Sequence, residues 1–132
     1  ICKVLDIEPN IAVISNGSFG KSIDSEEIME AIELAKQVNP KLKVEGDLDL
    51  ETALKPALAK NYPFSNADGN ANVLVFSNAQ AADAAIKSLT LFGGFKICAK
   101  VIQGFSAPLQ VAEPEASADD IFNLAVIAAA NI

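Results

Sequence analysis

The sequence predicts an α/β fold, a mostly parallel sheet with helices on both of its faces. Short apolar runs of strand length, such as residues 72–76, alternate with longer segments in which apolar residues recur at helical spacing, such as residues 28–38. In addition, 51% of the 132 residues are hydrophobic, which is enough for a buried core. Strands that are separated by helices cross over and pair in parallel, so helices come to cover both faces of the sheet.

Four strands are expected. Residues 11–15 form a continuous apolar run, as in a strand that is covered on both faces, and residues 42–46 form a weaker, alternating strand. Residues 72–76 are the clearest strand, and residues 95–103 are the fourth. We therefore expect a parallel sheet of at least four strands, with residues 73–76 near its centre.

The first two helices are bounded by capping residues and by a proline. Asp24 and Glu27 have the spacing of a capping box, and Pro40 ends the helix that they begin. Asp47 or Asp49 caps a second helix, whose apolar positions continue to residue 58.

The last two helices carry similar signals. Ser77 or Asn78 can cap an alanine-rich helix that ends at Gly93, and Ser117 with Asp120 forms a second capping-box pattern. The final helix is apolar nearly all round, so we expect part of its surface to be exposed or covered by another chain.

Charge and composition exclude several classes of function. The net charge of −7 disfavours binding to nucleic acid. All ten cations are Lys, and without His or Arg the chain can form no Ser-His-Asp triad, no His-bearing metal site and no bidentate Arg clamp on phosphate. No apolar run approaches the ~20 residues of a membrane span. Since the chain starts at Ile1 with no basic-then-apolar leader, we expect a fragment or a trimmed product rather than a signal peptide. We also expect a cytoplasmic protein without a membrane partner.

The two cysteines form no metal-binding or redox motif. Cys2 and Cys98 lie far apart in sequence, and Cys98 sits within an apolar run. We interpret them as idle thiols in a reducing compartment, with a disulfide between them as the alternative.

One loop resembles a phosphate-binding motif. Ligands of parallel sheets bind beyond the carboxyl ends of the strands, which here are residues 16–22, 77–80 and 103–106. Residues 15–22 nearly spell a P-loop, but the cap at Asp24 starts the helix late and no later strand ends in an Asp for magnesium. A plain turn or a weaker anion-binding loop is favoured, with Lys21 either solvated or in contact with a ligand.

An acidic cluster precedes and begins the last helix. Its members are Glu113, Glu115, Asp119 and Asp120. We interpret these carboxylates as solvated charges that favour a helix N-terminus, and acid–base chemistry is the alternative. Their spacing does not indicate a metal site.

Three segments, in order, resemble the C-terminal part of the phosphate acetyl- and butyryltransferases, the phosphotransacetylase family. They are residues 11–49, with IAVIS, the Gly20 loop and VEGDLD; residues 71–81, with ANVLVF and QA; and residues 93–121, with GGF, IQG, Pro108 and SADDI. The resemblance implies an isocitrate/isopropylmalate dehydrogenase-like fold. Residues 1–106 would then be a partial inner domain, and residues 107–132 a linker and C-terminal helix that packs on an outer domain.

The resemblance also implies an activity and a site. Family enzymes move an acyl group between coenzyme A and phosphate, with coenzyme A or acetyl-CoA as substrate or effector and no covalently bound cofactor. The implied partners are acyl-CoA, phosphate, and either further copies of the chain or a missing N-terminal half. The family pattern places catalysis on Asp120 and coenzyme A binding on Gly20, Lys21, Gln103, Gly104 and Ser117.

Two departures from the family pattern affect the expected function. The Ser-Arg pair of the family falls on Glu113 and Pro114, and residues 18–20 are similar to the acyltransferase-like tail of bacterial malic enzymes, which is inactive and senses acetyl-CoA. We expect the C-terminal portion of a phosphate acyltransferase that is inactive alone. The alternatives are a non-catalytic acetyl-CoA-sensing domain of a malic enzyme and a P-loop-like nucleotide binder.

Overall fold

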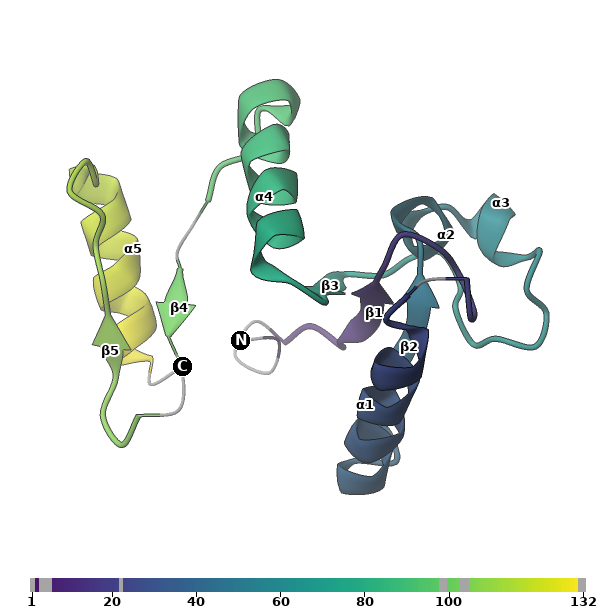
Figure 1. Ribbon diagram of the computed structural model, residues 1–132. Coiled ribbons are helices and arrows are strands. Elements are labelled where there is room, and N and C mark those ends of the chain that lie inside the picture. Colours follow the sequence, from purple (N-terminus) through teal and green to yellow (C-terminus); the bar gives the residue numbers. More distant parts are fainter. Residues whose placement is uncertain (1, 3–5, 22, 98–99, 103–104, 131–132) are drawn as a thin grey trace. The chain divides into compact units, whose positions relative to one another are not determined.

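The computed structural model describes the chain except for residues 1, 3–5, 22, 98–99, 103–104 and 131–132. It divides into two compact units, one formed by Glu8–Ala85 and the other by Ile1–Ile7 with Ile86–Ile132. In chain order (Figure 1) the elements are β1 (Asn10–Ile14), α1 (Ser25–Val38), β2 (Lys43–Leu48), α2 (Leu50–Leu54), α3 (Pro56–Ala59), β3 (Val73–Phe76), α4 (Ala79–Gly93), β4 (Val101–Ile102), β5 (Leu109–Gln110) and α5 (Ala118–Ala129).

The Glu8–Ala85 unit contains a parallel sheet with the strand order β2-β1-β3. The predicted α/β class with parallel strands is therefore confirmed. Two details are wrong for the described residues: the sheet has three strands, and its centre is β1, as Figure 1 shows, whereas β3 lies at an edge. Val75 of β3 is accordingly 44% exposed, while Ala12 of β1 is 2% exposed.

The segment predicted as a fourth parallel strand is instead part of an antiparallel hairpin. Val101 pairs with Gln110 and Ile102 with Leu109, so β4 and β5 make a two-stranded sheet of their own. The physical reason is the short connection between them. Parallel pairing needs a crossover of a dozen or more residues, whereas strands that are joined by six residues can pair only in antiparallel fashion.

Side chains of β1 alternate between two apolar clusters, one on each face of the sheet. Ala12 and Ile14 pack with Leu48 and with Ala53 of α2. On the other face, a second cluster contains the buried side chains of α1 and β2, Ile28, Ile32 and Val44, with Ile11 and Val13 of β1 packed against it. This alternation is the period of two that an extended strand imposes, and it places α1 and α2 on opposite faces as predicted.

The capping predictions are confirmed at three helices, α2, α4 and α5, and wrong at α1. The side chain of Asp49 accepts a hydrogen bond from the Thr52 amide at 2.8 Å, and that of Asn78 accepts one from the Ala81 amide at 2.8 Å. Asp24 precedes α1 but makes no side-chain cap. Its φ and ψ of −93° and 15° depart from the extended conformation that aims an N-cap oxygen at the helix amides.

Proline divides the predicted second helix. The helix ends at Leu54, Lys55 is extended, and Pro56 begins the short α3. A residue before proline is disfavoured in helical conformation, and proline itself has no N–H to continue the hydrogen-bonding ladder.

Helices α4 and α5 leave several large apolar side chains exposed. No residue of α4 is buried, and Leu124 is the one buried residue of α5. Phe122 is 67% exposed, in agreement with the expected exposure of apolar surface on the last helix, and association with another chain stays a prediction. None of the helices in the described part of the chain has the length and apolarity needed to cross a membrane.

Candidate functional site

The loop between β1 and α1 folds around the carboxylate of Asp47, whose exposed fraction is 0%. The Gly20 amide donates to Asp47 Oδ1 at 3.0 Å, and the Ser25 hydroxyl donates to Oδ2 at 2.6 Å. The Phe19 amide donates to the main-chain carbonyl of Asp47 at 2.9 Å. A P-loop leaves such donors for a phosphate, but here they bind a carboxylate of the same chain. The Gly20 and Phe19 amides are thus engaged within the chain, which argues against the P-loop interpretation, and nucleotide binding stays an untested prediction.

A second carboxylate of the same segment fastens the other side of the loop. The buried Ser18 hydroxyl donates to Asp49 Oδ2 at 2.5 Å and accepts from the Asp49 amide at 3.0 Å, while Thr52 donates twice to Asp49. Burial raises the pKa of Asp49, but the hydrogen bonds from Ser18 and Thr52 outweigh burial and lower this pKa below its ordinary value. Asp49 is thus a structural anion that joins the loop to the start of α2.

The loop also carries a partly buried aromatic ring and an exposed lysine. Phe19 and Gly20 both have positive φ, 54° and 84°, and the Phe19 ring lies 4.8 Å from that of Tyr62 and 4.9 Å from that of Phe64. Lys21 is exposed, and the space that a Cβ on Gly20 would enter is open. The Gly20 amide already donates to Asp47. Contacts of Gly20 and Lys21 with coenzyme A stay a prediction.

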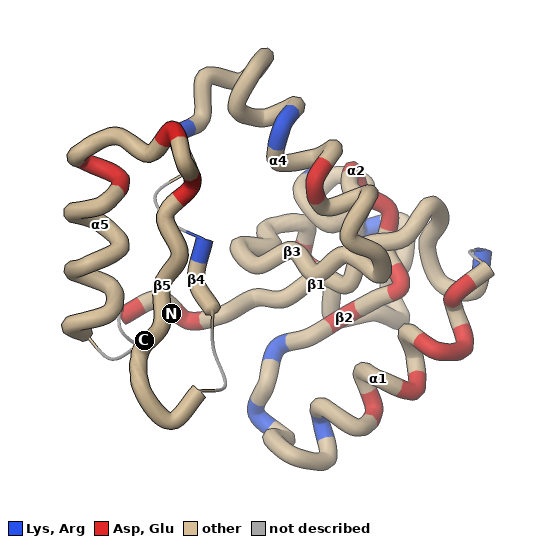
Figure 2. Tube along the Cα trace, turned by 60° about the vertical axis from the view of Figure 1, so that its left-hand side comes forward, with Lys and Arg blue, Asp and Glu red and all other residues tan. Residues whose placement is uncertain are grey.

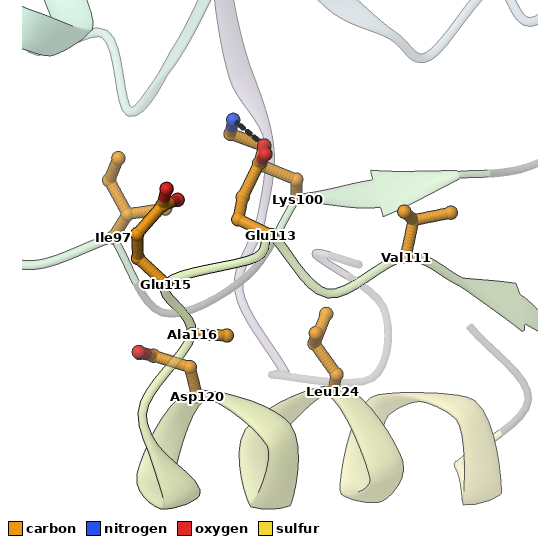
Figure 3. A pocket seen from close by; sticks show the side chains of 8 residues that line it. All are labelled: Ile97, Lys100, Val111, Glu113, Glu115, Ala116, Asp120 and Leu124. Carbon is orange, nitrogen blue, oxygen red and sulfur yellow. Dashed lines mark hydrogen bonds and ion pairs between the residues drawn. The ribbon is translucent and has the colours of Figure 1, made fainter.

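The unit that contains Ile86–Ile132 has a cavity of about 260 Å³ at the N-terminal end of α5. Figure 3 shows Asp120 and Leu124 on α5 pointing toward the segment that carries Glu113 and Glu115. Lys100 enters beside Glu113. Apolar side chains supply the rest of the lining: Ile97, Val111 and Ala116.

The predicted capping box of α5 is confirmed and includes two of the candidate site residues. Asp120 Oδ2 accepts from the Ser117 amide at 2.8 Å and from the Ser117 hydroxyl at 2.6 Å. In return, the Asp120 amide donates to the Ser117 hydroxyl oxygen at 3.2 Å. These bonds, first from the side chain and then from the backbone of Ser117, hold the pKa of Asp120 below its ordinary value, and the charge of Lys96 adds to them.

Glu113 is an ion-pair partner of Lys100, with 2.5 Å between the Lys100 ammonium nitrogen and Glu113 Oε1. The hydrogen bond and then the charge of Lys100 lower the pKa of Glu113. The prediction of a solvated acidic cluster did not include Lys100. The two residues are 13 positions apart and flank β4 and β5, so the antiparallel pairing of these strands brings them together. A prediction of the hairpin would have indicated the ion pair.

The candidate residues do not all lie in the cavity beside α5. Gln103, Gly104 and Cys98 lie outside the described residues. Cys2 is a free cysteine. Gly20 and Lys21 belong to the Glu8–Ala85 unit, and Ser117 and Asp120 to the other. Within the described part of the chain, no group of three or more acidic or cysteine side chains is arranged to hold a metal ion.

Comparison with known proteins finds close similarity over nearly the entire chain. A phosphate acetyltransferase of Bacillus subtilis is 34% identical over 131 residues, which is 97% of this chain and 41% of that protein. A crystal structure of a phosphotransacetylase from Streptococcus pyogenes superposes with a TM-score of 0.91 at 33% identity, covering 98% of this chain and 40% of that one. The NADP-dependent malic enzyme of Rhizobium meliloti is 29% identical over 99% of this chain and 18% of its own length.

The chain therefore spans about two fifths of the length of the phosphate acetyltransferase that it matches. The family model for phosphate acetyl/butaryl transferase matches residues 1–129. A match of this extent, together with the agreement in backbone structure, shows that the chain belongs to the phosphate acetyl/butaryl transferase family.

Proposed function

We propose that the chain is the C-terminal portion of a phosphate acyltransferase, which converts acyl-CoA and phosphate to acyl phosphate and coenzyme A, and that it is inactive by itself. The observation that carries this proposal is the family match over residues 1–129, combined with a cavity at the N-terminus of α5 that is lined by Lys100, Glu113 and Asp120.

The cavity suits the thioester end of acetyl-CoA better than a nucleotide. Its volume of about 260 Å³ lies just below the usual range for ligand pockets, and much of its lining is apolar. A carboxylate with a lowered pKa is a weak base toward a thiol, whose pKa is near 8.5. We therefore assign Asp120 the role of accepting a hydrogen bond from the coenzyme A thiol, with Ser117 orienting the carboxylate.

Phosphate is the substrate that this chain is least suited to bind. The chain has no Arg, and the carboxylate of Glu113 stands where the family has its Ser-Arg pair. Glu113 also engages Lys100, a cation that lines the cavity, through an ion pair. A phosphate that approached this wall would meet a like charge.

We predict no acyl transfer from acetyl phosphate to coenzyme A by the 132-residue chain. The variant Glu113→Ser with Pro114→Arg should not restore it, because the activity of the family resides in proteins more than twice this length. Formation of acetyl-CoA would be followed by the absorbance of the thioester. Turnover above a heat-denatured control in either protein would contradict the proposal of an inactive portion.

A non-catalytic acetyl-CoA-sensing domain of a malic enzyme is the second candidate. The similarity to the malic enzyme of Rhizobium meliloti over 99% of the chain supports it, as does the Glu113–Lys100 ion pair in place of a phosphate-binding arginine. Acetyl-CoA would then be an effector and no phosphate would bind.

Several further features belong to the same proposal. We place the protein in the cytoplasm, as a homo-oligomer or in contact with an N-terminal half, and without nucleic-acid or membrane partners. We also retain the dehydrogenase-like two-domain arrangement, with residues 1–106 in the inner domain and residues 107–132 reaching the outer one.

Acetyl-CoA binding tests both candidates. We expect a high-micromolar Kd, on the order of −5 to −6 kcal/mol, by calorimetry at low salt. Lys21→Glu should weaken binding about fivefold because it reverses a charge beside the phosphates of the ligand. Asp120→Asn should change affinity little.

Lys41→Glu is the matched control, since it makes the same charge change at the amino end of β2, whereas Lys21 follows the carboxyl end of β1. Equal weakening in both variants would remove Lys21 from the site. No binding of acetyl-CoA to the wild-type chain at millimolar concentration would reject both candidates.

A further inference from the structure

A polar cavity of about 510 Å³ lies at the amino ends of β1 and β2, within the Glu8–Ala85 unit. Asn10, the first residue of β1, and Lys43, the first of β2, both line it. The end of α1 contributes Lys36, and the connection to β2 contributes Lys41. A volume of this size accommodates a small metabolite. The function proposed above makes no use of this cavity.

The two acidic side chains of the cavity are already bound by the protein. Glu45 accepts from the Lys36 ammonium at 3.0 Å and from the Ser65 hydroxyl at 3.1 Å. Asp68 accepts from the Asn70 amide at 2.9 Å and from the Asn10 side-chain amide at 3.0 Å, and these two bonds, in that order, hold the pKa of Asp68 below its ordinary value. The oxygens of both carboxylates are therefore directed at groups of the chain itself.

Two cations of the cavity are left over. Within the described residues, the ammonium groups of Lys41 and Lys43 make no hydrogen bond and no ion pair within 4 Å. Three of the ten lysines line this cavity together with two acids, Glu45 and Asp68. The lining therefore carries a formal charge of +1, whereas the net charge of the chain is −7. Figure 2 shows the same concentration, with blue segments where α1 runs into β2.

We propose that this cavity binds a small organic polyanion through Lys41 and Lys43. Its carboxylates or its phosphate would meet the exposed ammonium groups of Lys41 and Lys43, the second of which also interacts with the charge of Asp68. The acids Glu45 and Asp68 set an upper limit on the affinity, because their charges remain even though their oxygens are bound.

The proposed site is separate from the acetyl-CoA loops. Lys21 follows the carboxyl end of β1, whereas Lys43 begins β2 at the amino end of the same parallel sheet. Strands of five to six residues put the two ends roughly 15–20 Å apart. An anion in this cavity would thus bind alongside acetyl-CoA, as an effector rather than as part of the substrate.

Calorimetry and thermal unfolding with two probes, citrate and inorganic pyrophosphate, test the proposal at constant ionic strength. We expect saturable binding of at least one probe with a Kd below about 5 mM, and a rise in the unfolding temperature. The double variant Lys41→Gln with Lys43→Gln should weaken it at least tenfold. The matched control Lys21→Gln should bind the probe like the wild type. A preference for citrate assigns a polycarboxylate ligand, and a preference for pyrophosphate assigns a phosphate ester.

Three results would overturn the proposal. The first is a signal that rises linearly with probe concentration, as it would with sodium chloride, instead of saturating. The others are a double variant that binds the probe as tightly as the wild type, and a Lys21→Gln variant that is weakened as much as the double variant. Because all three lysines are exposed, far-UV circular dichroism should show the same fold for every variant. Acetyl-CoA affinity, measured on the same proteins, should be unchanged in the double variant. If the wild type does not bind acetyl-CoA but does bind the probe, the result counts against the proposed function and not against this site.

Discussion

Replacing Asp47 by alanine is expected to destabilise the Glu8–Ala85 unit by about 3–5 kcal/mol, as measured by urea unfolding. The Asp47 carboxylate is fully buried and accepts from the Gly20 amide and the Ser25 hydroxyl. The substitution leaves these donors without their acceptor, at about 1–3 kcal/mol each, and also creates a void. Since the loop that carries Lys21 is folded on this carboxylate, acetyl-CoA binding should be lost as well.

Asp24→Ala is the matched control, because Asp24 precedes α1 but makes no side-chain cap. Alanine at a functioning N-cap costs about 1 kcal/mol, whereas here we expect less than about 0.5 kcal/mol. Asp47→Asn should fall between the two, since an amide keeps one acceptor oxygen and turns a donor toward another donor. Stability within 1 kcal/mol of the wild type in Asp47→Ala would show that the loop does not depend on this carboxylate.

Replacing Gly69 by alanine should destabilise the same unit by about 3 kcal/mol or more. Gly69 is buried at a φ of +74°, and a Cβ there would lie 2.4 Å from the carbonyl carbon of Lys55 and from the nitrogen of Pro56. Left-handed backbone costs an alanine about 1–2 kcal/mol. The overlap adds to this cost, because the atoms that are struck belong to the main chain at the break between α2 and α3 and cannot move away by changing rotamer.

Gly20→Ala separates the two contributions. Gly20 has a similar φ of +84°, but nothing lies within 4 Å of the position that a Cβ would take. Only the conformational cost of about 1–2 kcal/mol should remain. If the two variants lose the same free energy of unfolding, the packing of residues 61–70 against Pro56 is looser than the structure indicates.

Local signals predicted the helix ends where one residue contacts its own helix. The caps at Asp49 and Asn78 and the box formed by Ser117 and Asp120 need only an oxygen placed two or three residues before an amide. Asp24 has the same local pattern but makes no side-chain cap, and the hydroxyl of the neighbouring Ser25 donates to the buried Asp47, 22 positions away. The hydrogen bond between Ser25 and Asp47 cannot be predicted from the residues around Asp24 alone.

The candidate site was predicted in part. The sequence brought Ser117 and Asp120 together and placed Glu113 nearby, because all three lie within eight residues of each other. Lys100 was missed, because its approach to Glu113 requires the antiparallel pairing of β4 and β5. The cavity lysines Lys41 and Lys43 were also missed, because nothing in their neighbourhood shows that Glu45 and Asp68 are bound by residues far along the chain.

Apolar periodicity, by itself, determined the α/β class, the parallel pairing and the covering of both sheet faces by helices, because these follow from burying one stripe of each helix and both faces of β1. Only the tertiary structure decided that β1 is central, that the loop after it closes on Asp47, and that Lys100 pairs with Glu113. The physical reason is that strand order and ion-pair choice depend on which distant segments meet. Their energies differ too little from those of the alternatives to leave a signature in any short stretch of sequence.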